Sequence, residues 1–140
     1  MVNKRLIGSY LKRAKVRREI LNQFMLKKSY SDVIRESQEI IELLEKAILL
    51  NLNVTPPKWH DVIDLIIKHS EKLKLDIKKD FKKIEKDCKW LRSQREISFY
   101  GDMDFIPEDF YGKKDAEKAI KIVNELFRII EKLSLNLEGK

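Results

Sequence analysis

Apolar residues recur at helical spacing along almost the whole chain, and this period constrains the fold more than any other feature. The clearest example lies between residues 30 and 48, where the apolar positions are Tyr30, Val33, Ile34, Ile40, Ile41, Leu44, Ala47 and Ile48. Similar patterns predict helices over residues 6–26, 77–91 and 115–133, and a short helix after residue 61. No segment alternates like a β-strand over any useful length. The sequence therefore predicts an all-α fold, an antiparallel up-down helical bundle of four longer helices and one short helix.

Two stretches interrupt the helical pattern. In NLNVTPPKWHD, residues 51–61, Pro56 and Pro57 remove two backbone donors, which predicts a loop. In FYGDMDFIPEDFYGKK, residues 99–114, the periodicity is lost and aromatic residues mix with acids, which predicts a second loop. Ser29 followed by Asp32 predicts a capping box at the start of the second helix, in which each side chain accepts a hydrogen bond from a backbone N–H.

Length and composition predict a single domain over residues 1–140 in a reducing compartment. Cys88 is the only cysteine, so no internal disulfide can form. The first residues contain no apolar stretch long enough for a signal sequence or a membrane span. We therefore expect a cytoplasmic protein that does not associate with membranes. The 38% of charged residues, with abundant Lys, Glu and Ile, is typical of proteins from thermophiles.

The net charge of +7 is concentrated in the first helix. Residues 1–28 hold nine bases and one acid, a net charge of +8, and the other 112 residues hold 21 bases and 22 acids. A basic face attracts nucleic acid or an acidic partner surface. The predicted nucleic-acid-binding residues are Lys12, Arg13, Lys15, Arg17 and Arg18. The alternative is a solvated helix face with no partner.

The order of features over residues 28–134 resembles a HEPN domain. The second predicted helix carries a Gln-x-x-x-Glu-x-x-x-Lys-Ala ladder at Gln38, Glu42, Lys46 and Ala47, and the following loop ends in His60. Later, FYGD follows an arginine-bearing helix, and DFYGKKDA opens the final helix. These runs are similar to the Tyr-Pro-Asp and Tyr-x-x-x-Asp-Ala motifs of the family. The co-linear series carries the resemblance, rather than any single motif.

The resemblance implies an up-down bundle that forms a homodimer. Some HEPN domains are metal-independent ribonucleases, often toxins, with an arginine followed four to six residues later by a histidine. Others act with a minimal nucleotidyltransferase encoded beside them, and nucleotide binding has been proposed for the family. We therefore expect a homodimer working with a small nucleotidyltransferase in a toxin–antitoxin-like pair, with RNA as a further partner and no cofactor other than a nucleotide.

The arginines of LRSQREISFYGDMDF, residues 91–105, lack the histidine of the ribonuclease members. The residues at that spacing are Glu96, Ile97, Ser98, Phe99, Tyr100 and Gly101. Cleavage without a metal needs a group that exchanges protons near neutral pH, which arginine cannot do. The sequence thus argues against the usual ribonuclease. The enzyme alternative would use Arg95 to stabilise a phosphate and His60 or Tyr100 to transfer protons.

Arg92 and Arg95 instead suit anion binding. They lie three residues apart on a helix, so their guanidinium groups project from adjoining turns and offer paired donors. We predict a phosphate-binding site formed by Arg92, Arg95, Glu42 and Lys46. The alternative is an ion pair that links two helices, and Glu42 and Lys46 also have the spacing of an ion pair within one helix.

The acids of the second loop do not have the spacing of a metal site. These acids are Asp102, Asp104, Glu108 and Asp109. They lack the twelve-residue calcium-loop pattern and a paired histidine, so we expect no bound metal. Tyr100 and Tyr111 in the same loop are modification targets if a nucleotidyltransferase partner exists, and core anchors otherwise.

Overall fold

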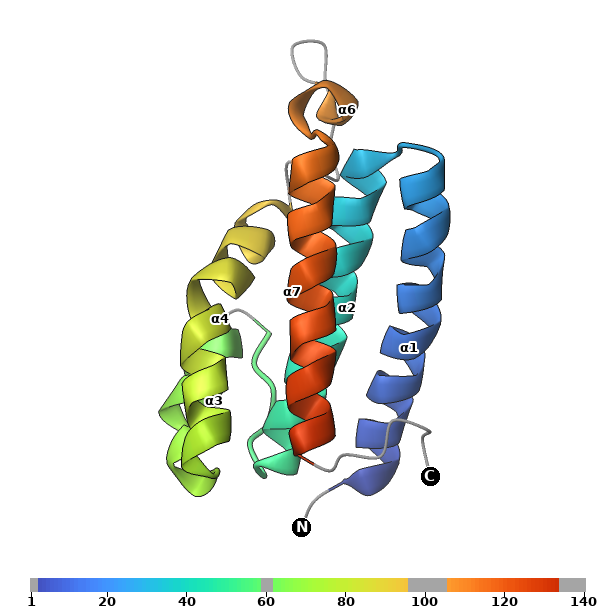
Figure 1. The fold of residues 1–140 in the computed structure, drawn as a ribbon. Helices are drawn as coiled ribbons and strands as arrows, with labels where there is room; N and C mark the ends of the chain where they lie inside the picture. Colours follow the sequence, from blue (N-terminus) through green and yellow to red (C-terminus); the bar gives the residue numbers. More distant parts are fainter. Residues whose placement is uncertain (1–2, 59–61, 96–105, 134–140) are drawn as a thin grey trace.

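Helices make up most of the described part of the chain, which is residues 3–58, 62–95 and 106–133 of the computed structural model. They are α1 (Lys4–Leu26), α2 (Tyr30–Asn51), α3 (Val62–Lys68), the 3₁₀ helix η1 (Ser70–Lys72), α4 (Leu75–Ser93), α6 (Pro107–Phe110) and α7 (Lys113–Lys132). The long helices α1, α2, α4 and α7 alternate in direction (Figure 1). The predicted all-α bundle is confirmed.

The central helix is α2, which contacts α1, α3, α4, α6 and α7. Figure 1 shows α1 at one edge of the molecule, α3 and α4 at the other, and α2 and α7 between them. Ile34, Ile40, Leu44 and Ile48 of α2 are fully buried. The apolar residues of α2 are buried, and most of its charged residues are partly exposed, which explains why the period over residues 30–48 is so clear.

The apolar stripes of the other helices meet α2 in one core. Leu11 and Ala14 of α1 and Phe81 and Leu91 of α4 are fully buried. From α7 the fully buried residues are Ala116, Ala119, Val123, Leu126, Ile129 and Ile130. Burying this much apolar surface is the main favourable term in the free energy of folding.

The chain leaves α2 through a backbone reversal at Asn53. Asn53 has a φ of 63°, a left-handed conformation that asparagine tolerates better than most residues. The N–H of Val54 donates to the carbonyl oxygen of Leu49 at 2.9 Å, which closes the helix end. The reversal directs the loop with Pro56 and Pro57 back along the end of α2.

Two local predictions differ from the structure. The Ser29 hydroxyl donates to the carboxylate of Asp32, and no side chain caps the start of α2, so the predicted capping box is wrong. The segment predicted as a loop over residues 99–114 contains α6, where Pro107 occupies a first-turn position that needs no backbone donor. A helix of four residues is too short to show a hydrophobic period.

An ion cluster joins α4 to α7. Lys132 Nζ lies 2.8 Å from Asp80 Oδ2, and Arg128 Nη2 lies 3.5 Å from Asp80 Oδ1. The hydrogen bond from Lys132 and the two nearby positive charges lower the pKa of Asp80 below its ordinary value of 3.8. The ionised carboxylate therefore stabilises the folded state.

We predict that Asp80→Asn lowers the free energy of unfolding at neutral pH. Because the pKa is lowered in the folded state, this contribution is fully present above pH 3.8 and is lost as the pH falls through the folded-state pKa. Urea unfolding of the parent and the variant from neutral to acid pH checks this, with Asp109→Asn on α6 as the control. A difference from the parent that stays constant down to acid pH would contradict the assignment.

We also predict that Leu44→Ala lowers the free energy of unfolding by about 3 kcal/mol, because it leaves a cavity beside the fully buried side chains of α2. Leu26→Ala removes a side chain that is 77% exposed and should cost less than about 0.5 kcal/mol. Urea denaturation measures both, and equal losses would contradict the central position of α2.

Candidate functional site

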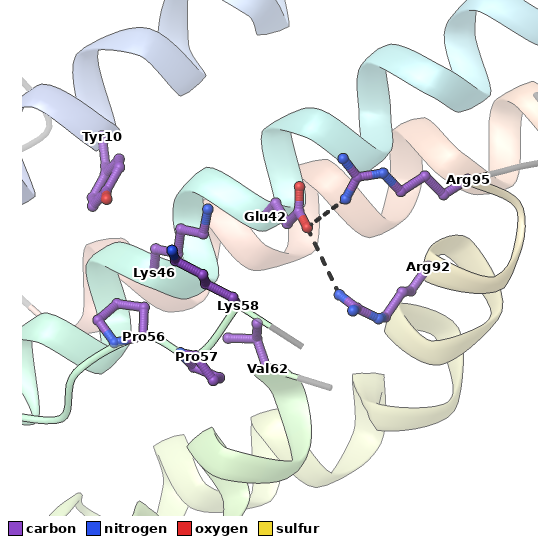
Figure 2. A pocket seen from close by; sticks show the side chains of 9 residues that line it. All are labelled: Tyr10, Glu42, Lys46, Pro56, Pro57, Lys58, Val62, Arg92 and Arg95. Carbon is purple, nitrogen blue, oxygen red and sulfur yellow. Dashed lines mark hydrogen bonds and ion pairs between the residues drawn. The ribbon is translucent and has the colours of Figure 1, made fainter. Parts of the chain in front are cut away.

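A pocket of about 330 Å³ opens where α2 meets the end of α4 and the proline loop (Figure 2). Its lining residues are Tyr10, Glu42, Lys46, Pro56, Pro57, Lys58, Val62, Arg92 and Arg95. Four of these side chains are cations and one is an acid, which gives the lining a formal charge of +3. A hollow with this charge attracts anions.

The elements of the bundle bring these groups together from distant parts of the chain. Glu42 and Lys46 lie one turn apart on α2. They lie at a seam, by which we mean a strip of α2 that the neighbouring helices leave uncovered. Arg92 comes from the last turn of α4, and Arg95 follows two residues after that helix ends. The structure therefore brings together all four residues that the sequence predicted for a phosphate-binding site.

Glu42 holds both arginines through one carboxylate oxygen. Arg95 Nη1 lies 2.8 Å from Glu42 Oε1, and Arg92 Nη1 lies 3.7 Å from the same atom. The side chains of Arg92 and Arg95 are nevertheless 31% and 45% exposed. The ion pair between helices is thus present, and a large part of each arginine still faces solvent beside the pocket.

Lys46 and Lys58 lie on the opposite side of Glu42 from the arginines, as Figure 2 shows. Neither lysine forms an ion pair with any residue in the described part of the chain, so the spacing of Glu42 and Lys46 does not produce a pair within α2. Among the described residues, Glu42 is the one acid that lines the pocket with these two lysines.

Sequence reasoning missed Tyr10, Lys58 and Val62 as lining residues. Tyr10 belongs to the apolar stripe of α1, and its ring faces the pocket from that helix (Figure 2). Lys58 directly follows Pro56 and Pro57, whose fixed φ angles stiffen the loop that carries it. A base placed next to a rigid proline pair is the sequence feature that points to Lys58.

Several other residues singled out from the sequence lie away from the pocket. Gln38, at the start of the ladder, is 2% exposed and belongs to the core. Tyr111 is 4% exposed, its hydroxyl donates to Gln94 at 2.9 Å, and burial raises its pKa to about 12. Tyr111 is therefore a core anchor. His60 and Tyr100 lie outside the described residues.

The basic residues of α1 divide into two groups. Arg17 Nη1 donates to Glu36 Oε1 at 2.8 Å, and Arg18 donates to Asn124 Oδ1 at 2.7 and 3.2 Å. These two arginines tie α1 to α2 and α7. Lys12, Arg13 and Lys15 are exposed, and the guanidinium carbon of Arg13 lies 5.9 Å from the centroid of the Tyr10 ring.

The bundle, the ladder on α2 and the arginines at the end of α4 agree with a comparison of the chain with family models. A model described as the HEPN domain matches residues 7–133. The chain belongs to the HEPN family. HEPN domains are nucleotide-binding, RNA-binding or ribonuclease-type modules. The match begins at Ile7 and so includes the basic helix, which the motifs read from the sequence did not cover. No curated protein and no solved structure matches the chain.

The described residues of this HEPN domain lack two features, a cluster of metal-binding side chains and a helix that could span a membrane. Within residues 3–58, 62–95 and 106–133, no group of three or more His, Cys, Asp or Glu side chains could hold a metal ion. None of the helices in these ranges is long and apolar enough to span a membrane.

We predict that the double variant Arg92→Met, Arg95→Met lowers the free energy of unfolding by less than about 1 kcal/mol, because partly exposed ion pairs contribute little. Urea denaturation measures the loss. A loss above about 3 kcal/mol would show that the arginines mainly brace the two helices, since that cost is typical of breaking a buried pair.

Proposed function

We propose that this HEPN domain binds a phosphate group of a nucleotide or of RNA in the pocket between α2 and the end of α4. The observation that best supports the proposal is the arrangement of four cations around one acid in a hollow of about 330 Å³. Two of these cations have no ion pair among the described residues. An anion that enters would compensate charges that the fold leaves unmatched.

The contact between Glu42 and the two arginines supports a phosphate as the ligand. Guanidinium groups bind carboxylate and phosphate oxygens with the same paired N–H donors. Glu42 Oε1 therefore occupies a position that a phosphate oxygen could take beside Arg95. A terminal phosphate carries more negative charge than a carboxylate, so it can displace Glu42 while Lys46 and Lys58 attract it from the other side.

Tyr10 gives the pocket an aromatic ring near the two lysines (Figure 2). Aromatic side chains stack on bases and pack against ribose in single-stranded nucleic acid. This feature favours a nucleotide or an RNA strand over inorganic phosphate. The proline loop supports the same reading, because a stiff loop loses little conformational freedom when a ligand binds.

Binding without cleavage is the activity that we favour. Arginine and lysine stabilise negative charge, but neither exchanges protons readily at neutral pH. No histidine lines the pocket among the described residues. The ribonuclease alternative depends on His60 or Tyr100, which lie outside them.

The partnership is a separate part of the proposal. We propose that the chain forms a cytoplasmic homodimer that works with a small nucleotidyltransferase in a toxin–antitoxin-like pair, as the resemblance of its sequence to HEPN domains implies. Co-expression with any nucleotidyltransferase encoded beside this chain, followed by size-exclusion chromatography, tests the pairing. Separate elution of the two proteins would remove it.

We predict that the double variant Lys46→Gln, Lys58→Gln binds a short fluorescent RNA about tenfold more weakly, because it loses two uncompensated charges. The double variant Lys82→Gln, Lys83→Gln is the matched control, since it removes two exposed lysines of α4 outside the pocket. Its affinity should fall less than about twofold. Fluorescence anisotropy at fixed salt measures all three proteins.

Glu42→Gln should have the opposite effect. It keeps the shape of the side chain but frees both arginines from a competing negative charge, so the RNA affinity should rise several-fold at low salt.

Equal losses of RNA affinity in Lys46→Gln, Lys58→Gln and in the α4 control would mean that only the general charge of the surface matters. Intact RNA after long incubation agrees with binding alone, whereas turnover abolished by Arg95→Ala would favour the ribonuclease.

A further inference from the structure

A second hollow, of about 590 Å³, lies against α1 at the edge of the bundle. Its lining residues are Lys12, Arg13, Val16, Arg17, Ile20, Phe24 and Glu36. None of them lines the anion pocket. We name this surface the α1 groove.

Apolar side chains form the floor of the α1 groove. Val16, Ile20 and Phe24 are spaced four residues apart, so they form a stripe about 12 Å long at 1.5 Å per residue. Val16 is 52% exposed and Ile20 is 40% exposed, and Phe24 packs partly against the core. Single exposed apolar residues are common on proteins, but a continuous stripe in a hollow indicates an interaction surface.

The rim of the α1 groove is basic. Lys12 and Arg13 are exposed beside Val16. Arg17 is held by Glu36, which is the one acid of the lining. With three bases and one acid, the groove has a formal charge of +2. All of its lining residues except Glu36 belong to residues 1–28, a segment of net charge +8.

We propose that the α1 groove docks an acidic amphipathic helix of a partner protein. Apolar residues of that helix, spaced three and four apart, would cover Val16, Ile20 and Phe24. Aspartate and glutamate on its flanks would pair with Lys12 and Arg13. This complementarity of charge around an apolar centre identifies the class of partner, and the inference does not depend on the function of the anion pocket.

The same features argue against the two other occupants. A second copy of this chain, pairing through the same groove, would bring two segments of net charge +8, residues 1–28 of each copy, against each other, and like charges repel. RNA would place phosphates over Val16 and Ile20, which cannot donate hydrogen bonds to them. An acidic helix matches both the stripe and the rim.

Three synthetic peptides of about 18 residues test the proposal with the full-length protein. The first is helical, with leucine three and four residues apart and glutamate at most other positions. The second replaces every glutamate with lysine, and the third scrambles the first sequence so that the leucines no longer share a face. Fluorescence anisotropy should show the first peptide binding at least about tenfold more tightly than the other two.

Surface variants locate the binding. Val16→Ser, Ile20→Ser should weaken binding of the first peptide at least about tenfold, because it removes the apolar floor. Leu26→Ser, Leu75→Ser is the matched control, since it removes two exposed apolar side chains outside the groove, and it should change the affinity less than about twofold. Circular dichroism of both variants checks that they stay folded.

Three outcomes would overturn the proposal. Equal binding of the scrambled peptide would show attraction by charge alone. A dimer that forms with rising concentration, and is lost in Val16→Ser, Ile20→Ser, would assign the groove to a second copy. No peptide binding, together with RNA binding that is lost in Lys12→Gln, Arg13→Gln and kept in Val16→Ser, Ile20→Ser, would assign the surface to nucleic acid.

Discussion

The burial of α2 is the constraint on which the rest of the structure depends. Five other helices contact it, so its apolar residues are buried against neighbours on several sides. Its charged residues can face water only where the surrounding helices leave a seam. Glu42 and Lys46 lie at such a seam, and the end of α4 brings Arg92 and Arg95 to the same place. The packing that stabilises the bundle thus also fixes the position of the charged pocket.

The charges in this pocket are balanced only in part. Glu42 neutralises one of the four cations and contacts both arginines, which holds the two guanidinium groups together against their mutual repulsion. Lys46 and Lys58 form no ion pair with any described residue. Under the proposed function, a phosphate ligand would compensate these charges with groups that already face the hollow.

The sequence predicted the helices well because a hydrophobic period repeats over many residues in each of them. Its failures were local. The Ser29 hydroxyl donates a hydrogen bond to the Asp32 side chain, so neither caps the backbone of α2. The helix α6 has only four residues, which is too short for a hydrophobic period to be recognised in the sequence. For the site, residue types and spacing pointed to Glu42, Lys46, Arg92 and Arg95. Tyr10 could not be placed there, because its contribution depends on how α1 packs, which spacing along the chain does not encode. Lys58 was missed although it directly follows the two prolines of the loop.

The most direct test of the anion pocket is a nuclear magnetic resonance titration of the arginine side chains with pyrophosphate. Arg128 is an internal control, because it is also held by acids, Glu125 and Asp80, but lies outside the pocket. We expect the Nε–Hε signals of Arg92 and Arg95 to shift and saturate as pyrophosphate is added, while the signal of Arg128 stays in place. Equal shifts of all three arginines, or no shift of Arg92 and Arg95, would contradict the assignment of this pocket to a phosphate ligand.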